Sequence, residues 1–383
     1  MESNVEQGLP NDMPAHNEAT PIGRGPYPVG STNMEIATSF ARDDQVMHEL
    51  LLGRGNSSVE HRFVSDVLEH PKSVWVNAVQ VPDRTELYGS ASGSSLPVVT
   101  FLTYPSSVGH TKNPYAFPYH DSAYGIFEDM LNDGEAPEFA DSDERYPLIL
   151  IVHGFSAHGI YDIQHAHDLA SHGYIVAVVN YGDNRTLDEA NPVRYAAFLR
   201  PFLTKEVIDS ILQSDTFGPH IDTDNIGLTG HSLGGYAGLA LAGARHQGNP
   251  ASVTDKRIKA NVIAAPWVGN VEHGLDVFAF DHSNSELRKV TTPTLCLFGT
   301  NDTDTPASLI LPAMKQLSGP TYVVELVGQP HVFEAASWKD RNGWELLFFS
   351  AYLKGDASSL AKLKALRSMT GGNENTQLLD YQK

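Results

Sequence analysis

One pentapeptide, Gly230-His231-Ser232-Leu233-Gly234, constrains the fold of this chain more than any other feature. A short apolar run at 226–229 precedes it and predicts a strand, and a stretch rich in small residues at 235–242 follows it and favours a helix. A serine at the apex of a strand-to-helix turn needs neighbours without bulk, and glycines two positions before and after it meet that need. The helix directs its first N–H groups towards the serine, where they can stabilise an oxyanion. The stretch therefore predicts an exposed nucleophile rather than an ordinary Gly-rich turn.

Two later segments supply partners for this serine. Asp302 follows an apolar strand predicted at 294–299, and His331 follows a strand predicted at 321–327. In such a set the serine attacks an acyl carbon, the histidine takes and returns its proton, and the aspartate fixes the imidazole tautomer. The chain order Ser, Asp, His is that of α/β-hydrolases. All three residues follow the ends of predicted strands, where open α/β sheets place their sites, so we predict a catalytic triad.

An upstream strand predicted at 148–153 ends in His153-Gly154-Phe155. In the α/β-hydrolase arrangement, the loop after this strand donates one N–H of the oxyanion hole, and the residue after the nucleophile donates the other. These positions assign the hole to the backbone N–H groups of Phe155 and Leu233. Gly154 lets a substrate oxygen approach the backbone, and we predict substrate contacts for Gly154 and for His231. His153 itself is interpreted as a structural loop histidine.

Composition limits the classes of partner. The chain carries 46 acidic and 26 basic residues, which gives a formal net charge of −20, and 41% of its residues are hydrophobic. This excess of negative charge argues against nucleic acid and anionic membranes as partners. The single cysteine, Cys296, lies among apolar residues, so we expect a buried, inert thiol and no intrachain disulfide.

No targeting or membrane-spanning segment is visible. The first twenty residues are polar, and no apolar run is long enough to cross a bilayer. We expect a cytoplasmic protein, or alternatively a secreted protein whose signal peptide has been removed. The sequence does not indicate an oligomeric state.

The chain is predicted to form one large domain with extensions. Residues 1–20 are interpreted as a disordered tail, 21–370 as a single domain, and 371–383 as a C-terminal tail. Strands predicted at 74–81 and 98–104 form a hairpin. Segments 31–72 and 105–145 are interpreted as insertions, the second of them a long loop that could line the active-site cleft.

From residue 148 onward, strands alternate with helices. The predicted strands are 148–153, 175–181, 226–231, 260–265, 294–299 and 321–327, and the predicted helices are 162–172, 192–214, 233–246, 306–318 and 342–354. Continuous apolar strands that alternate with helices are typical of βαβ units around a buried parallel sheet. The fold class is therefore α/β, with a mostly parallel sheet covered by helices on both faces.

Further segments narrow the choice within this class. The segments that carry a family resemblance lie between about Pro97 and Leu353, and they are 146–155, 169–176, 230–235, 265–267, 299–302 and 328–331. They are similar to dienelactone-hydrolase-like and platelet-activating-factor-acetylhydrolase-like esterases, and to the cutinase and polyester-hydrolase group. The resemblance implies a serine esterase without a cofactor, acting on a small-molecule or polymeric ester. It also implies that Trp267 forms an aromatic wall for the substrate, although a tryptophan packed in the core is an equal alternative.

Two acidic residues compete with Asp302. Asp304 lies two positions further in the same loop, but Asp302, three residues after Gly299, matches the position of the acid in the resembling family. A turn-capping role is the expected alternative for Asp304. Glu325 lies in the middle of an apolar strand, which disfavours it. The loop after Phe155 is more polar than is usual in the group, so the substrate stays open.

A metal-dependent hydrolase and a non-catalytic binding protein are the two alternative functional classes. The histidines between 153 and 172, with two aspartates, could bind zinc in a metal-dependent hydrolase, but their spacing does not match paired ligands on one helix face. These residues are His153, His158, His165, His167, His172, Asp162 and Asp168. A non-catalytic binding protein is disfavoured by the intact triad. Arg185 could bind a substrate carboxylate, although a surface ion pair is the favoured interpretation.

Overall fold

The computed structural model describes residues 18–19, 23–33, 76–107, 115–120, 123–127, 131, 136–155, 157, 159–181, 192–246, 253–269, 280, 285–366, 368–369 and 376–380. The strands are β1 (Glu18–Ala19), β2 (Val29–Asn33), β3 (Val76–Gln80), β4 (Ser95–Pro105), β5 (Tyr115–His120), β6 (Ala123–Phe127), β7 (Tyr146–Val152), β8 (Ile175–Asn180), β9 (Ile221–His231), β10 (Ile258–Ala264), β11 (Thr294–Gly299), β12 (Thr321–Leu326), β13 (Ser368–Met369) and β14 (Thr376–Asp380). The α-helices are α3 (Thr85–Tyr88), α4 (Ile163–Ser171), α6 (Pro192–Gln213), α7 (Leu233–Leu241), α8 (Ala307–Met314), α9 (Ala335–Leu353) and α10 (Ala357–Ala365).

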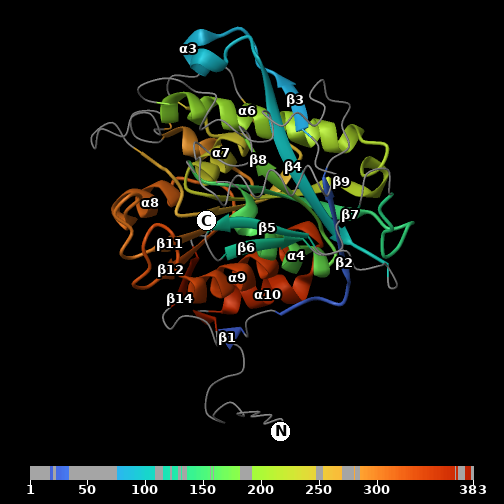
Figure 1. Cartoon of the computed structure of the whole chain (residues 1–383). Coiled ribbons are helices and arrows are strands. Elements are labelled where there is room, and N and C mark those ends of the chain that lie inside the picture. Colours follow the sequence, from blue (N-terminus) through green and yellow to red (C-terminus); the bar gives the residue numbers. More distant parts are fainter. Residues whose placement is uncertain are drawn as a thin grey trace, which may run out of the picture.

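One large sheet organises the molecule (Figure 1). In the described part of the chain it has ten strands in the order β14-β12-β11-β10-β9-β7-β8-β4-β2, with β3 paired to β4. The neighbours from β12 through β8 run parallel, whereas β14, β4, β2 and β3 pair antiparallel. Strands β7, β8 and β11 are buried at every position, as expected where helices cover both faces. The predicted mostly parallel α/β-hydrolase fold is confirmed.

The strand order reverses next to β7. The chain passes from β7 through α4 to β8 on one side, and then crosses back through α6 to β9 on the other side of β7. The carboxyl ends of β7 and β9 therefore adjoin at a topological switch point, which is where open α/β sheets bind ligands. The loop at 153–155 and the pentapeptide at 230–234 meet at this point.

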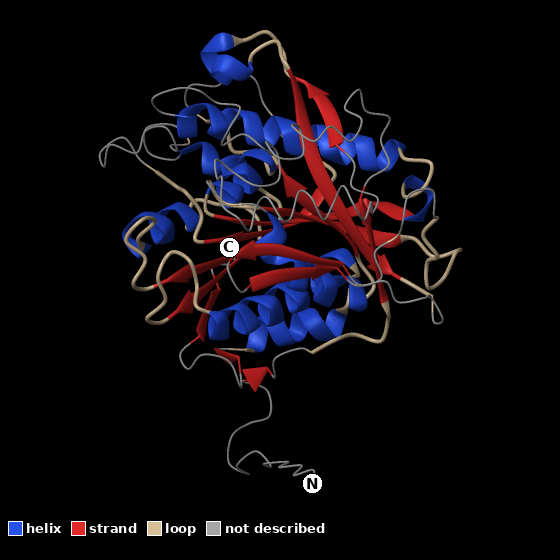
Figure 2. Cartoon of the chain, in the orientation of Figure 1, coloured by secondary structure: helices blue, strands red, loops and turns tan. Residues whose placement is uncertain are grey.

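Helices pack on both faces of the sheet (Figure 2). One apolar core is buried on each face. Helices α6, α7 and α8 cover one face, with Leu199, Leu239 and Ile310 among the buried residues. Helices α4, α9 and α10 cover the other face, where Trp344 and Phe348 are buried. The turn before α7 is thus supported from both sides of the sheet.

The predicted elements after residue 146 are all present, with shifted ends. Helix α7 stops at Leu241 rather than at 246, because Gly243 adopts φ 125°, which a helix does not allow. Helix α9 begins at Ala335 rather than at 342. The prediction overlooked α10, whose amino end is capped by the Asp356 carboxylate, which accepts from the N–H groups of Ser358 and Ser359.

The amino-terminal half holds one confirmed prediction and one correction. Strands β3 and β4 pair antiparallel, as the predicted hairpin requires, with α3 in their connection. The segment 105–145 was predicted as a loop, but it contains the antiparallel pair β5 and β6. Proline and polar residues in this pair disguise the strand pattern.

The predicted tails and the first insertion lie mainly outside the described residues. Residues 18–19 and 31–33 are described as parts of β1 and β2. The segment predicted as a C-terminal tail, 371–383, contains β14, which pairs with β12 at the edge of the sheet. The domain boundaries stay predictions.

Candidate active site

Ser232 occupies a strained turn between β9 and α7, with φ 55° and ψ −116°. Positive φ is unfavourable for a residue with a side chain, and it persists only where the surroundings enforce it. Here a Cβ on Gly230 would overlap the Gly234 backbone, and a Cβ on Gly234 would overlap the Val152 carbonyl. The Ser232 N–H also donates to the Ala264 oxygen at 2.9 Å. The two glycines of the pentapeptide therefore allow the close packing that holds the serine at the apex.

The structure brings Ser232, His331 and Asp302 together. His331 Nε2 lies 2.9 Å from Ser232 Oγ, and Nδ1 lies 2.8 Å from Asp302 Oδ2. Ser232 and Asp302 are each only 4% exposed, and the histidine side chain is 15% exposed. With the proton on Nδ1, the free Nε2 lone pair faces the serine hydroxyl, which is the arrangement that general-base catalysis requires.

Asp302 has a full set of donors around its carboxylate. Oδ1 accepts from the N–H groups of Asp304 and Thr305, each at 2.8 Å, and Oδ2 accepts from the Thr305 hydroxyl at 2.7 Å as well as from His331. Burial disfavours the charged form, but the hydrogen bonds from His331 and Thr305 outweigh it and hold the pKa of Asp302 below its usual value. Asp304 is exposed, and only its backbone contacts this carboxylate.

Two backbone N–H groups flank the serine. Within the described residues, neither the Phe155 N–H nor the Leu233 N–H has a hydrogen-bond partner. Gly154 lies directly beside the nucleophile, because a Cβ built on it would be 3.3 Å from the Ser232 Cβ. Unpaired N–H groups next to a nucleophile are what an oxyanion hole requires.

A buried arginine holds the loop that carries one of these groups. Arg200, on α6, is fully buried and donates to the His153 carbonyl at 2.5 Å, while its guanidinium lies 5.1 Å from the centre of the Tyr181 ring. His153 also lies against this ring, at 5.3 Å between centroids. Sequence analysis overlooked Arg200, whose only signal is a cation inside an apolar helical segment.

His231 faces the catalytic histidine. Its Nε2 donates to the His331 carbonyl oxygen at 2.8 Å. Burial and the neighbouring His331 lower the pKa of His231 to about 3, so the ring is neutral near pH 7. The structure thus gives His231 a contact that fixes the His331 backbone. Its predicted contact with substrate stays a prediction.

Trp267 lies at the edge of the site. Its ring centre is 6.2 Å from that of His331, in an edge-on arrangement, and the backbone N–H of Trp267 donates to the Ser232 carbonyl at 3.1 Å. The side chain is half-buried and packs against the apolar core. The position is compatible with both predicted roles, a substrate wall and a core contact. Val332, beside the histidine, is 64% exposed.

A second buried polar group lies on the opposite face of the sheet, beneath β9. Arg341, on α9, donates to Glu345 at 2.5 Å, to Asp162 at 3.4 Å and to the Thr229 hydroxyl at 3.3 Å. His165 Nε2 lies 2.8 Å from the other Glu345 oxygen. Burial disfavours ionisation of Glu345, but Arg341 and His165 lower its pKa to about 2. The network ties α9 to α4 and to the strand that carries the nucleophile.

The described histidines that are candidate zinc ligands each have a different hydrogen-bond partner. His165 contacts Glu345, His167 lies 3.2 Å from Ser31 Oγ, and His172 donates to the Gly23 oxygen at 2.7 Å. Across the part of the chain that the structure describes, no group of three or more His, Cys, Asp or Glu residues is placed to hold a metal ion. His158 and Arg185 lie outside that part. Cys296 is buried, as expected, and burial raises the pKa of its thiol.

The fold, the strained serine and the order of the triad are those of serine-type α/β-hydrolases. Comparison with known proteins agrees. The model of the Chlorophyllase family matches residues 139–254. The uncharacterized peptidase YuxL of Bacillus subtilis (strain 168) is 26% identical over 281 residues, which cover 67% of this chain and 41% of that protein. Cutinase est1 of Thermobifida alba is 29% identical over 140 residues, which cover 37% of each chain.

This chain therefore spans about two fifths of the length of the relatives it matches. The matches confirm the predicted resemblance to cutinase-related esterases. Among the described residues, no helix is both long and apolar enough to cross a membrane.

Proposed function

We propose that this chain hydrolyses carboxylic esters through an acyl-enzyme intermediate on Ser232. The observation that carries the proposal is the continuous set of hydrogen bonds from Ser232 through His331 to Asp302. The N–H groups of Phe155 and Leu233, which have no hydrogen-bond partner among the described residues, support it. A nucleophile, a base, an orienting acid and donors for an oxyanion are the parts that acyl transfer needs.

Each part has one role in two successive steps. His331 Nε2 takes the hydroxyl proton as Ser232 Oγ bonds to the ester carbon, and the Phe155 and Leu233 N–H groups stabilise the oxyanion. The alcohol leaves with the proton from His331, and Ser232 retains the acyl group. Water then donates a proton to His331 and attacks the acyl carbon. The bond to Ser232 Oγ breaks, Oγ regains the proton, and the carboxylic acid leaves.

The test combines one variant with one covalent probe. Ser232→Ala should lose hydrolysis of p-nitrophenyl esters, because the triad acts as a unit and removal of one member costs most of the rate. The wild-type chain should form a stable phosphonate adduct on Ser232, detected by intact mass and peptide mapping. Substantial residual turnover in the purified variant, or an adduct at another residue, would contradict the proposal.

Polyester hydrolysis is a second candidate for the substrate. The half-buried Trp267 and the exposed Val332, both beside His331, favour it, because an apolar rim can contact an aromatic or aliphatic polymer. A panel from acetate to octanoate esters, with an aromatic polyester film, separates the two. Release of soluble acids from the film by wild type but not by Ser232→Ala would support polymer hydrolysis. Activity confined to small esters would exclude it.

A further inference from the structure

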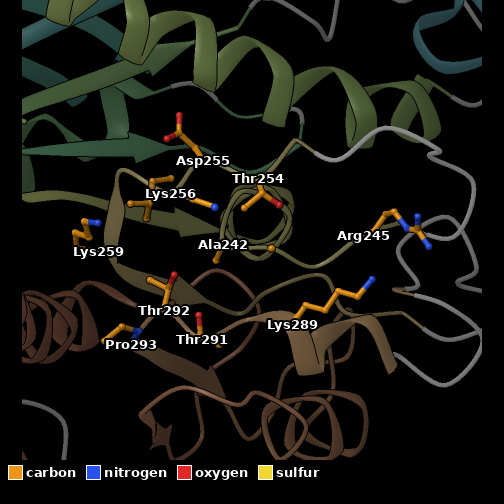
Figure 3. A pocket seen from close by; sticks show the side chains of 12 residues that line it. Ala242, Arg245, Thr254, Asp255, Lys256, Lys259, Lys289, Thr291, Thr292 and Pro293 are labelled. Carbon is orange, nitrogen blue, oxygen red and sulfur yellow. The ribbon is translucent and has the colours of Figure 1, made fainter. Parts of the chain in front are cut away.

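A cavity lies at the opposite end of helix α7 from the nucleophile (Figure 3). It has a volume of about 600 Å³ and is lined by the end of α7, the start of β10 and the segment before β11. Four of the twelve lining residues are cations, namely Arg245, Lys256, Lys259 and Lys289, and the only acidic one is Asp255. The whole chain has a formal net charge of −20. The lining of this cavity, in contrast, carries a net positive charge.

The single lining carboxylate does not neutralise these cations. Asp255 is buried and receives two hydrogen bonds from the Arg257 side chain, at 2.9 Å and 2.5 Å. Arg257 is therefore the partner of Asp255, and it does not line the cavity. Within the described residues, the exposed side chains of Lys256 and Lys259 have neither an ion pair nor a hydrogen bond.

The other two cations share one acid. Lys289 Nζ lies 2.6 Å from Glu286, and Arg245 Nε lies 3.6 Å from the same carboxylate oxygen. One negative charge for two positive charges leaves a net positive charge on this side also. Figure 3 shows Lys256 and Lys259 on one side of Ala242 and Arg245 and Lys289 on the other, and Thr291 and Thr292 add hydroxyl groups to the wall.

The end of helix α7 does not cancel this charge. A helix carboxyl terminus is usually negative, because its last carbonyl groups lack partners. Here the Asp255 N–H donates to the Leu241 oxygen, the Gly243 N–H to Ala240, and the Ala244 N–H to Leu239. With these three carbonyls satisfied, the helix end offers less negative charge to the neighbouring cations.

We propose that this cavity binds a small multivalent anion of the phosphate class, held by Lys256 and Lys259 on one side, with Arg245 and Lys289 on the opposite side. Flexible ammonium groups pair with phosphate as point charges, and an arginine side chain adds directional donors. The site is separate from the triad, because the nine residues of α7 span about 13 Å at 1.5 Å per residue. The proposal does not rest on ester hydrolysis.

The experiment titrates the full chain with sodium pyrophosphate by calorimetry at fixed ionic strength, with sodium chloride as the background control. Saturable binding is expected, with an affinity that falls as salt rises. The double variant Lys256→Gln/Lys259→Gln should bind at least 10-fold more weakly. Lys339→Gln/Lys362→Gln removes the same charge from exposed positions on α9 and α10, and it should bind as wild type does.

A second measurement needs no variant. Pyrophosphate should protect Lys256 and Lys259 of the wild-type chain from acetylation, as read by peptide mass spectrometry, and should leave Lys339 reactive. The titration should be unchanged after a phosphonate has modified Ser232. Absence of saturable binding, equal binding by the two double variants, or loss of binding after phosphonate treatment would each overturn the proposal. Binding of citrate but not of pyrophosphate would overturn the phosphate class.

Discussion

Asp302→Asn is the substitution that tests the proposed mechanism most directly. The new amide keeps the shape of the carboxylate but replaces one acceptor oxygen by an N–H₂ donor. The Oδ1 position faces the backbone N–H groups of Asp304 and Thr305, which cannot rotate away. The amide oxygen must therefore take this position, and the N–H₂ group must face His331 Nδ1.

This orientation forces the wrong tautomer on the base. Nδ1 becomes an acceptor, so the proton moves to Nε2, 2.9 Å from Ser232 Oγ. A protonated Nε2 cannot accept the serine proton, and the loss should resemble that of other triads with the same change, about 10⁴-fold in kcat. This corresponds to about 5.5 kcal/mol of transition-state stabilisation.

The assay is the steady-state hydrolysis of a p-nitrophenyl ester, with circular dichroism to verify folding. Asp304→Asn is the matched control, because only the backbone of this exposed residue contacts the carboxylate, and its kcat should stay within about 2-fold of wild type. More than about 1% of wild-type kcat in Asp302→Asn, or a larger loss in the control, would refute the tautomer argument.

Four further outcomes are expected. First, kcat/KM should rise with pH through the range in which a histidine base becomes neutral, and a falling profile would exclude such a base. Second, Glu345 has a pKa lowered from 4.5 to about 2, so its ionised form stabilises the fold above pH 4.5, and this contribution should disappear as pH falls towards 2. Urea unfolding across this range should show a weaker pH dependence for Glu345→Gln than for wild type, and equal slopes would contradict the assignment. Third, Arg200→Met should remove the hydrogen bond from the guanidinium to the buried His153 carbonyl, which lowers stability by about 1–3 kcal/mol, and it should lower kcat about 10-fold or more by displacing the Phe155 N–H. Unchanged kcat in folded Arg200→Met would show that the loop needs no such anchor. Fourth, prolonged EDTA or phenanthroline treatment should leave the rate unchanged, whereas loss of activity that zinc restores would favour the metal-dependent alternative.

The sequence predicted those parts of the fold that depend on residues close together in the chain. Ser232, Asp302 and His331 each follow a continuous apolar run, and such runs predict buried parallel strands whose carboxyl ends share one edge. The glycines around Ser232 are predictable for a steric reason, because a tight turn at the serine leaves no room for a side chain at these positions. For this reason, the sheet and the proximity of the three residues follow from patterns of ten residues or fewer.

The overlooked features depend on contacts between distant segments. Arg200 contacts the His153 carbonyl across 47 positions of sequence, and Arg341 contacts Asp162 across 179. A buried arginine has no periodic pattern, so only the assembled structure reveals its partner. The β5 and β6 pair was overlooked for a different reason, because Pro118 interrupts the alternation that marks a strand.

Pairing of this kind also fixes the order in which a growing chain can become functional. A ribosome releases residues from the amino end, so the nucleophile turn at 230–234 emerges about a hundred residues before Arg341. Until α9 follows, one face of β9 lacks its cover, and Asp162 and Thr229 lack the guanidinium that binds them in the finished molecule. His331 also emerges only shortly before this helix. Closure of the fold and assembly of the reactive serine therefore coincide, and a chain made only as far as the nucleophile turn holds a serine without its base.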